Sequence, residues 1–365
     1  MKIKSSSASG LLALAIIAGG CSLNSKFDLK MKIEPLGKNI TVTPENLKSA
    51  AAIIKKRLNC LGIPDKSLKI EVSQGCINLD LSKFDTSNTE IVEKLVTVPG
   101  KIAFWETYEN KDVIGYLNKA NKILADHKIV TYSPEAEEPA AQKQPQETPA
   151  GGPSPEDMLK TTTEATNNQK SRDFRIKNPL FGILEPMVSR DGEPMPSCLI
   201  GLADARDTSK VNSMIRMKEI KDILPHDLKF AWGRYPYRFD KSKYELIAIK
   251  DSAGDGRAPL EGDVIISAKA EIKGSNIRLG FSMNPEGAAV WSGMIRNNLN
   301  HCIAVTIDGY VRSYPRVMTE IKSGNTEITG DFTDSEARYL ADIFNSGGSG
   351  LPVRLRVAEE KMAMK

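Results

Sequence analysis

The stretch of sequence that decides the fold is residues 280–344, which read GFSMNPEGAAVWSGMIRNNLNHCIAVTIDGYVRSYPRVMTEIKSGNTEITGDFTDSEARYLADIF. The NPE at 284–286 is typical of a helix start, because Asn caps a helix N-terminus and Pro is favoured in the first turn. The DG at 308–309, between two apolar runs, predicts a tight β-hairpin. The TDSE at 333–336 is a capping box that opens a second helix. The stretch therefore predicts strands and helices whose order is fixed by three local signals.

Flanking strands expected at 277–283 and 351–357 complete the order β-α-β-β-α-β, which is the ferredoxin-like plan. Residues 27–108 show the same order, although the residues themselves do not repeat. The elements expected there are a strand at 27–33, a helix from Thr43, strands at 68–73 and 76–81, a short helix near 91–95 and a strand at 101–108. We therefore predict an α+β fold in which two ferredoxin-like βαββαβ halves, residues 21–109 and 276–360, form a base.

Residues 110–275 lie between the two halves and predict an inserted, small α+β head subdomain. Within this insert, residues 133–171 are rich in Pro, Glu, Gln, Thr and Ala and offer almost nothing to bury, so we expect a disordered loop. The other patterns in the insert predict helices at 115–129 and 211–223 and strands at 199–203, 228–232 and 244–249.

Residues 1–20 are predicted to be a lipoprotein signal peptide. Lys2 and Lys4 precede a short apolar run at 11–18, which is too short to span a bilayer, and small residues lead directly to Cys21. In such signals the cysteine thiol receives the lipid, so Cys21 is the expected lipidation site. The alternative is an ordinary secretory signal in which Cys21 is incidental. We expect a membrane-anchored protein of the cell envelope that faces the periplasm, on either the inner or the outer membrane.

The other four cysteines are Cys60, Cys76, Cys198 and Cys302. An oxidising compartment permits disulfides, and most pairings among the four stay open. Cys60 is expected at a helix end and Cys76 at the far end of the following strand, about 20 Å away at ~3.3 Å per residue. Because a disulfide needs Cα atoms within about 7 Å, we predict that these two cysteines are not bonded.

The sequence holds no pattern that indicates enzyme chemistry. It lacks a nucleophile elbow, a P-loop and a dinucleotide-binding motif, and the DSAGDGRAPLEGD at 251–263 fails the EF-hand pattern at positions 3 and 12. Its three histidines lack metal-ligand spacing, and a net charge of +4 with mixed signs gives no electrostatic basis for nucleic-acid binding. We expect no enzymatic activity, no catalytic residue, no cofactor and no metal site.

Several motifs, in a constant order, resemble the first large periplasmic domain of the SecD and SecDF protein-export subunits. The resemblance lies in an N-(A/P)-E-G-A helix start at 284–288, the hairpin at 308–309, a V-x-S-x-P-x-V segment at 311–317 and an I-x-G-x-F-T segment at 328–333. The segments APLEGDVIISAKAEI from Ala258, VPGKIAFWETYEN from Val98 and AAAIIKKRLNCLGI from Ala50 are also similar. The family's early D-L-x-G-G signature is reduced here to DLKMK at 28–32.

The resemblance implies a base with a mobile head that engages polypeptide during export. Hinge movement is expected near Tyr108, Lys111, Lys269 and Gly274, and an aromatic head surface at Trp232, Tyr235 and Tyr237, although core or turn packing also explains these aromatics. The expected partners are unfolded or exported polypeptide, Sec translocon components, or both. No stretch after the signal is long enough to span a membrane, so proton-driven pulling by this chain alone is not expected.

Two functions from different classes follow. The first is a lipid-anchored accessory of protein export that binds translocating polypeptide or a Sec partner, for example by adding a strand to a sheet edge. The second is an envelope scaffold lipoprotein that has the SecD-like fold without a role in export. Because fold alone does not establish function, the choice depends on what the protein contacts.

Overall fold

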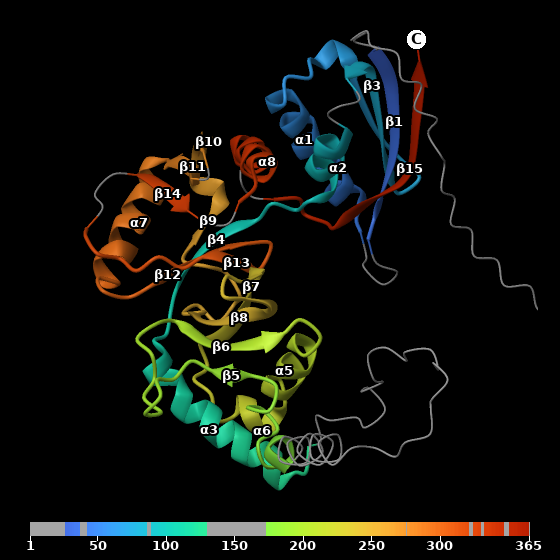
Figure 1. Ribbon diagram of the computed structural model, residues 1–365. Helices are drawn as coiled ribbons and strands as arrows, with labels where there is room; N and C mark the ends of the chain where they lie inside the picture. Colours follow the sequence, from blue (N-terminus) through green and yellow to red (C-terminus); the bar gives the residue numbers. More distant parts are fainter. Residues whose placement is uncertain are drawn as a thin grey trace, which may run out of the picture.

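The computed structural model describes residues 26–36, 42–85, 89–129, 173–274, 276–320, 324–329, 332–346 and 350–364. The expected signal peptide, Cys21 and the expected loop at 133–171 lie outside these residues. The described residues form a mixed α+β structure with three sheets (Figure 1).

The first sheet has four antiparallel strands in the order β15-β1-β3-β2. Its strands are β1 (Lys26–Pro35), β2 (Leu68–Ser73), β3 (Cys76–Asp85) and β15 (Leu355–Met364). The helices that accompany the sheet are α1 (Pro44–Cys60), α2 (Thr89–Thr97) and the short 3-10 helix η1 (Asp65–Ser67). The Thr43 hydroxyl accepts a hydrogen bond from the Asn46 N–H at 3.2 Å, so the predicted helix start is confirmed. The apolar faces of α1 and α2 share one buried core with β1 and β3, to which the two helices contribute Ile54 and Leu95.

The fourth strand of this sheet is not the one that the sequence predicts. Residues 101–108 were expected to pair with β1, but β4 (Ile102–Glu106) lies in another sheet and β15 takes the place beside β1. The burial of β4 explains the difference: its first four residues are all buried, as in a strand covered on both faces, whereas an edge strand would alternate. The ferredoxin-like half predicted at residues 21–109 is therefore not confirmed, because the last strand of the chain completes its sheet.

The second sheet has three antiparallel strands in the order β10-β11-β14. They are β10 (Ile265–Lys273), β11 (Asn276–Met283) and β14 (Asn325–Thr329). The helices nearby are α7 (Pro285–Asn297) and α8 (Asp334–Asn345), which begin where the sequence predicts: Asn284 caps α7 and Thr333 caps α8. The strand β14 was not predicted, since NTEIT is short and mostly polar.

The third sheet has eight strands in the order β5-β6-β8-β7-β13-β12-β4-β9. They are β4, β5 (Glu185–Pro186), β6 (Leu199–Asp204), β7 (Leu228–Tyr237), β8 (Asp240–Lys250), β9 (Leu260–Glu261), β12 (Ile303–Ile307) and β13 (Tyr310–Ser313), with the 3-10 helix η4 (Gly262–Val264) after β9. Strands β11 and β12, which a ferredoxin-like half would place in one sheet, thus lie in two, so the half predicted at residues 276–360 is not confirmed either. The expected head strands continue directly into β13 and β12, through a parallel pairing of Val311 with Gly233.

Helices α3 (Asn110–Asp126), α5 (Thr208–Ile215) and α6 (Lys218–Lys221) lie on the far side of the third sheet from the other two sheets (Figure 1). The single helix expected at 211–223 is divided in two, because Met217 has an extended backbone with ψ 142° between α5 and α6. These helices share their own buried core with β6 and β8.

The third sheet curls back on itself where β4 ends. Thr107 forms an antiparallel bridge with Ile249 after β4, and the Tyr108 N–H donates to the Ala248 carbonyl at 3.2 Å. The end of β4 therefore reaches β8, although β7, β13 and β12 lie between these strands in the sheet order. The curl encloses a third core of mostly small side chains, among them Ala103, Ala231, Cys198, Cys302 and Ala304.

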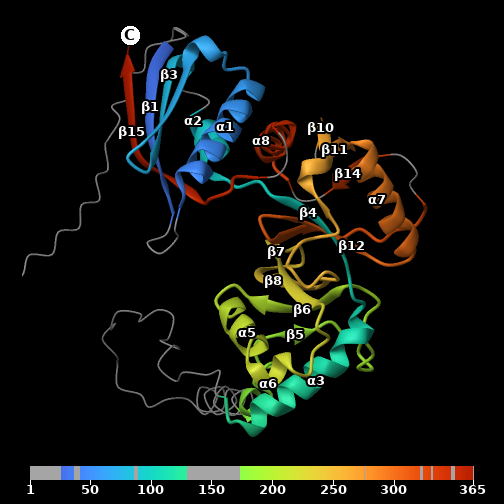
Figure 2. The same ribbon diagram turned by 180° about the vertical axis from the view of Figure 1, so that it is seen from behind.

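Helix α8 joins the first two sheets, lying between α1 and β10 in both views (Figures 1 and 2). Leu340 and Phe344 of α8 belong to the same buried core as Leu58 of α1 and Leu279 of β11. The Asn345 side chain pairs with the edge of β10 as a neighbouring strand would: its Oδ1 accepts the Ala268 N–H at 2.7 Å and its Nδ2 donates to the Ala268 carbonyl at 2.9 Å.

Arg57 of α1 is fully buried and holds the connection between α2 and β4. Its guanidinium donates to the carbonyls of Leu95, Val98 and Pro99 at 2.9, 2.6 and 2.6 Å. Burial lowers the pKa of Arg57 to about 10, so the side chain stays charged at neutral pH. The carbonyls at the end of a helix lack intrahelical partners, and Arg57 supplies donors to them.

We expect Arg57→Met to lower the free energy of unfolding by about 3 kcal/mol, because three buried carbonyls lose a charged donor. The measurement is urea unfolding followed by circular dichroism. Lys56→Met, on the exposed face of the same helix, is the matched control and should change stability by less than about 0.5 kcal/mol. Equal midpoints for the two variants would contradict this role of Arg57.

Candidate functional site

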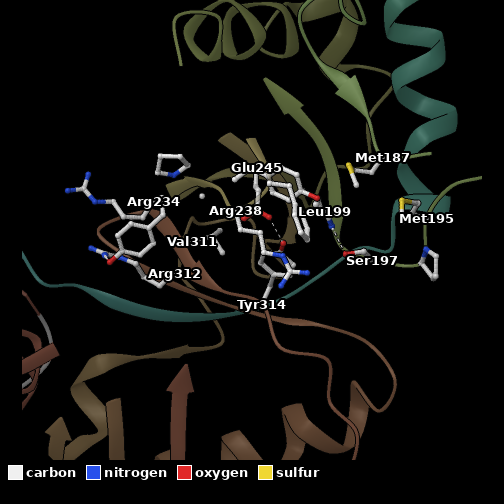
Figure 3. A pocket seen from close by; sticks show the side chains of 16 residues that line it. Met187, Met195, Ser197, Leu199, Arg234, Arg238, Glu245, Val311, Arg312 and Tyr314 are labelled. Atoms are coloured by element: carbon white, nitrogen blue, oxygen red, sulfur yellow. Dashed lines mark hydrogen bonds between the residues drawn. The ribbon is translucent and has the colours of Figure 1, made fainter. Parts of the chain in front are cut away.

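A pocket with a volume of about 530 Å³ lies where the expected head meets the rest of the third sheet. We call it the junction pocket. It is lined by Met187, Met195–Ser197, Leu199, Gly233–Phe239, Glu245, Val311, Arg312 and Tyr314. These residues come from β7, β8 and β13 and from the segment that leads into β6. Figure 3 shows Met187 and Met195 at one end, Arg234 and Arg312 at the other, and Glu245 with Tyr314 between them.

The aromatic residues singled out from the sequence divide between the junction pocket and the core beneath α5. Tyr235 and Tyr237 line the junction pocket, whereas Trp232 does not. The pairing of β7 with β8 is irregular between Trp232 and Tyr237, and every residue from Gly233 to Phe239 lines the pocket, so strict strand alternation does not apply here. The Trp232 indole packs instead against the core beneath α5, where its Nε1 donates to Asn212 Oδ1 at 3.0 Å.

Tyr235 takes part in a buried link between three elements. Arg312 of β13 pairs with Glu336 in the first turn of α8, and its guanidinium also donates to the Tyr235 hydroxyl at 2.7 Å. The Tyr235 hydroxyl in turn donates to Glu336. The Arg312 side chain is only 6 % exposed, so its charge depends on Glu336 for compensation. Burial, and then the hydrogen bond to Glu336, raise the pKa of Tyr235, which therefore stays protonated at neutral pH.

A second, partly buried hydrogen bond crosses the pocket floor. The Tyr314 hydroxyl, which follows β13, donates to Glu245 Oε1 of β8 at 2.6 Å (Figure 3). Burial, together with the Glu245 charge, raises the pKa of Tyr314 and keeps it a donor. The floor is therefore a fixed polar surface.

The pocket rim carries cations beside aromatic rings. The Arg238 guanidinium lies 4.3 Å from the Phe239 ring centroid, and that of Arg234 lies 5.8 Å from the ring of Tyr310. Phe239 is 72 % exposed and Met195 is 43 % exposed, so large apolar side chains face solvent at the pocket mouth. Such a surface suits a partner that carries both apolar groups and hydrogen-bond acceptors.

Most pocket residues were missed by sequence reasoning. Arg312, Tyr314, Glu245 and Met187 come from three separate parts of the chain, and none belongs to a recognisable motif of a binding site. The VRSYP at 311–315 did carry a signal, since it falls in the V-x-S-x-P-x-V segment, but only the fold shows that its arginine and tyrosine face β7 and β8.

The four hinge candidates lie in hydrogen-bonded regions. The Tyr108 hydroxyl donates to Asp227 Oδ1 at 2.6 Å, and Lys111 lies in the first turn of α3. Lys269 pairs with Gly280 inside the β10–β11 hairpin, and Gly274 has φ 60° at the turn of that hairpin. Movement at these residues stays a prediction.

Within the described ranges, no three His, Cys, Asp or Glu side chains gather in a way that could hold a metal ion. Asp251, the first residue of the calcium-like stretch, is buried; it pairs with Lys229 and accepts the Gly256 N–H. This carboxylate therefore holds a turn, as the failed EF-hand pattern suggests. No helix in the described part of the chain is long and apolar enough to span a membrane.

Comparison with known proteins shows what this chain is similar to. Residues 241–353 match the family model for "SecDF, P1 head subdomain", a segment that begins in β8 and ends just before β15. The chain is 27 % identical to the protein translocase subunit SecD of Rhodothermus marinus over 205 residues, covering 55 % of this chain and 31 % of that protein. It is 34 % identical to SecD of Sebaldella termitidis over 185 residues, covering 50 % of this chain and 38 % of that protein. The chain carries a SecD-like domain.

The resemblance seen in the sequence motifs is thereby confirmed. The chain spans about a third of the length of these SecD relatives. Among solved structures, the crystal structure of SecDF in a "Super-membrane-facing form" aligns with 93 % of this chain and 30 % of that chain, at 17 % identity and a TM-score of 0.47. A structure of "a membrane component SecDF that enhances protein export" aligns with 90 % of this chain and 98 % of that chain, at 17 % identity and a TM-score of 0.44.

We expect Glu336→Gln to lower the free energy of unfolding by about 3 kcal/mol, because it leaves the buried Arg312 cation without its counter-charge. Urea unfolding provides the measurement. Asp334→Asn is the matched control: it also removes a carboxylate from the first turn of α8, but an exposed one, so the loss should be at most about 1 kcal/mol. Equal losses would mean that Glu336 acts only on the helix dipole.

Proposed function

We propose that this chain is a lipid-anchored accessory of protein export that faces the periplasm and binds extended polypeptide, or a Sec translocon component, at the junction pocket. The similarity to SecD supports the relation to export. The composition of the junction pocket supports polypeptide binding. The accessory would have no proton-driven, enzymatic or cofactor-dependent activity of its own.

The observation that carries this proposal is the mixed lining of the junction pocket. Methionines adapt to side chains of many shapes, and exposed aromatic rings add apolar area at low entropic cost. Arginines at the other end can donate to backbone carbonyls or to acidic side chains. A partner with apolar groups and carbonyls in regular alternation, such as an extended polypeptide, matches this lining.

Docking in the pocket is better supported than strand addition at the sheet edges. The edge of β10 is already occupied by the Asn345 amide. The edge strand β2 carries the exposed pair Lys69 and Glu71, which are charges that discourage a further strand. The short strand β14 is also an edge, but its exposed residues are polar.

Site-specific photo-crosslinking in intact cells tests the binding function. A crosslinker at Phe239, on the pocket rim, is expected to capture Sec components or many unrelated exported chains. The matched control is Ile266, which is also exposed and apolar but lies in β10 outside the pocket, and should capture few of them. A single abundant envelope partner at Phe239, without Sec components, would instead support the scaffold function.

Lipid anchoring has a separate test at Cys21. We expect the wild-type chain to incorporate labelled fatty acid and to sediment with membranes, and Cys21→Ala to lose both properties, because the thiol is the attachment point. Ser22→Ala is the matched control and should behave as wild type. Label that persists in Cys21→Ala would contradict a lipid on this cysteine, and an unlabelled wild type would favour the ordinary secretory signal.

A further inference from the structure

Cys198 and Cys302 meet inside the small core that the third sheet encloses. Cys198 directly precedes β6 and Cys302 directly precedes β12, so they belong to opposite sides of the expected boundary between head and base. Both are free thiols and both are buried, with 0 % and 4 % exposure. Both belong to one cluster of apolar side chains with Ala231 and Ala304.

Two independent routes of strand pairing and hydrogen bonding connect the segments that carry these cysteines. On one side, Cys302 bridges Arg316, whose guanidinium donates to the Pro196 carbonyl at 2.8 Å, two residues before Cys198. The second route starts at the Cys198 carbonyl, which accepts a hydrogen bond from the Ala248 N–H at 3.1 Å. Ile249, the residue after Ala248, forms a β-bridge with Thr107. The Thr107 hydroxyl in turn donates to the Cys302 carbonyl at 2.7 Å.

Both side chains lie in the same buried cluster at the end of these routes. The interaction between the two thiols lowers the pKa of Cys302 and raises that of Cys198, and the Arg316 cation adds to the lowering. The arrangement provides one thiol that ionises readily beside one that stays protonated, which is the asymmetry that favours thiol–disulfide exchange.

We propose that Cys198 and Cys302 form a disulfide that covalently joins the two sides of the junction. The oxidant is a disulfide donor, either a small molecule or a protein. The Cys302 thiolate attacks one sulfur of the donor, whose other sulfur leaves as a thiolate. The Cys198 thiol then loses its proton and attacks the Cys302 sulfur, and the second donor thiolate leaves. Two electrons and two protons pass to the donor, which ends as two thiols.

The other two cysteines of the described chain provide the contrast. Cys60 is exposed at the end of α1, and Cys76 begins β3, where its thiol lies 3.8 Å from Glu34 Oε1. Among the described residues, neither belongs to a buried apolar cluster that holds a second cysteine. That Cys60 and Cys76 are not bonded to each other stays a prediction, and the proposed pair is a different one.

Formation of this disulfide in cells depends on the proposed function in one respect: the envelope location supplies the oxidant. To test the disulfide, the full chain is isolated from cells after acid treatment, which stops thiol exchange. Free thiols are then alkylated in denaturant without reduction, and linked peptides are mapped by mass spectrometry. We expect a Cys198–Cys302 link, retained in Cys60→Ser and Cys76→Ser and lost in Cys198→Ser and Cys302→Ser. Links from Cys198 or Cys302 to any other cysteine would overturn the proposal.

If Cys198 and Cys302 are both free thiols in the chain isolated from cells, a second experiment decides what this means. The purified chain is unfolded, reduced and refolded with glutathione disulfide, and its links are mapped in the same way. A Cys198–Cys302 link there would support the pairing and contradict the envelope location, whereas mixed or absent links would overturn the pairing itself. Reduction of the linked chain should also speed hydrogen exchange at the amides of Tyr108 and Ala248, which lie on the backbone route between the cysteines.

Discussion

The whole structure depends on the burial of β4 and of the polar residues directly after it. β4 pairs with β12 and β9, and Thr107 then bridges β8. The next buried polar residues, Glu109 and Asn110, each need a partner, since an unpaired polar group in a protein interior costs about 1–3 kcal/mol. Glu109 faces Arg316 at 3.5 Å, and the Asn110 amide donates to the Met187 carbonyl at 2.5 Å.

This requirement places the functional features next to one another. The partners of the buried polar residues are Arg316, Met187 and Ser197, which border either the cysteine pair or the junction pocket. The segment that leads into β6 is therefore held by polar contacts on one side and lines the pocket on the other. A pocket wall fixed in this way loses little conformational entropy when a partner binds, which favours affinity.

Local signals in the sequence predicted local structure, and their limits explain what was missed. Thr43, Asn284 and Thr333 cap their helices as expected, because a cap depends on residues three positions away. The partner of β1 could not be found in this way, because residues 101–108 and 355–364 both have strand patterns. Only the fold shows that the first segment is buried on both faces and therefore belongs to another sheet, which leaves the second segment to pair with β1. The small strand β14 gave no pattern at all.

The candidate site was predicted only in part for a related reason. The sequence grouped Tyr235 and Tyr237 with Trp232, but only the two tyrosines line the junction pocket, and Trp232 packs against the core beneath α5. Arg312 could not be recognised as a buried residue from its sequence context, because its burial depends on Glu336 and on a tyrosine 77 positions earlier in the chain. Polar residues are buried only when such distant partners compensate them, so their place in a core becomes visible only with the fold.

The same long-range contacts limit where a head could move against a base. Tyr235 of β7 bonds to Arg312 and Glu336, Tyr314 bonds to Glu245 of β8, and the Tyr108 hydroxyl bonds to Asp227. Rotation about the junction would separate several of these pairs at once and leave charged groups without partners. Each charged hydrogen bond contributes about 1.5–3 kcal/mol, so an open form that loses two of them is rare unless a partner stabilises it. A polypeptide that occupies the junction pocket and supplies carbonyls to the arginines there would be such a partner, which links binding and movement to one set of residues.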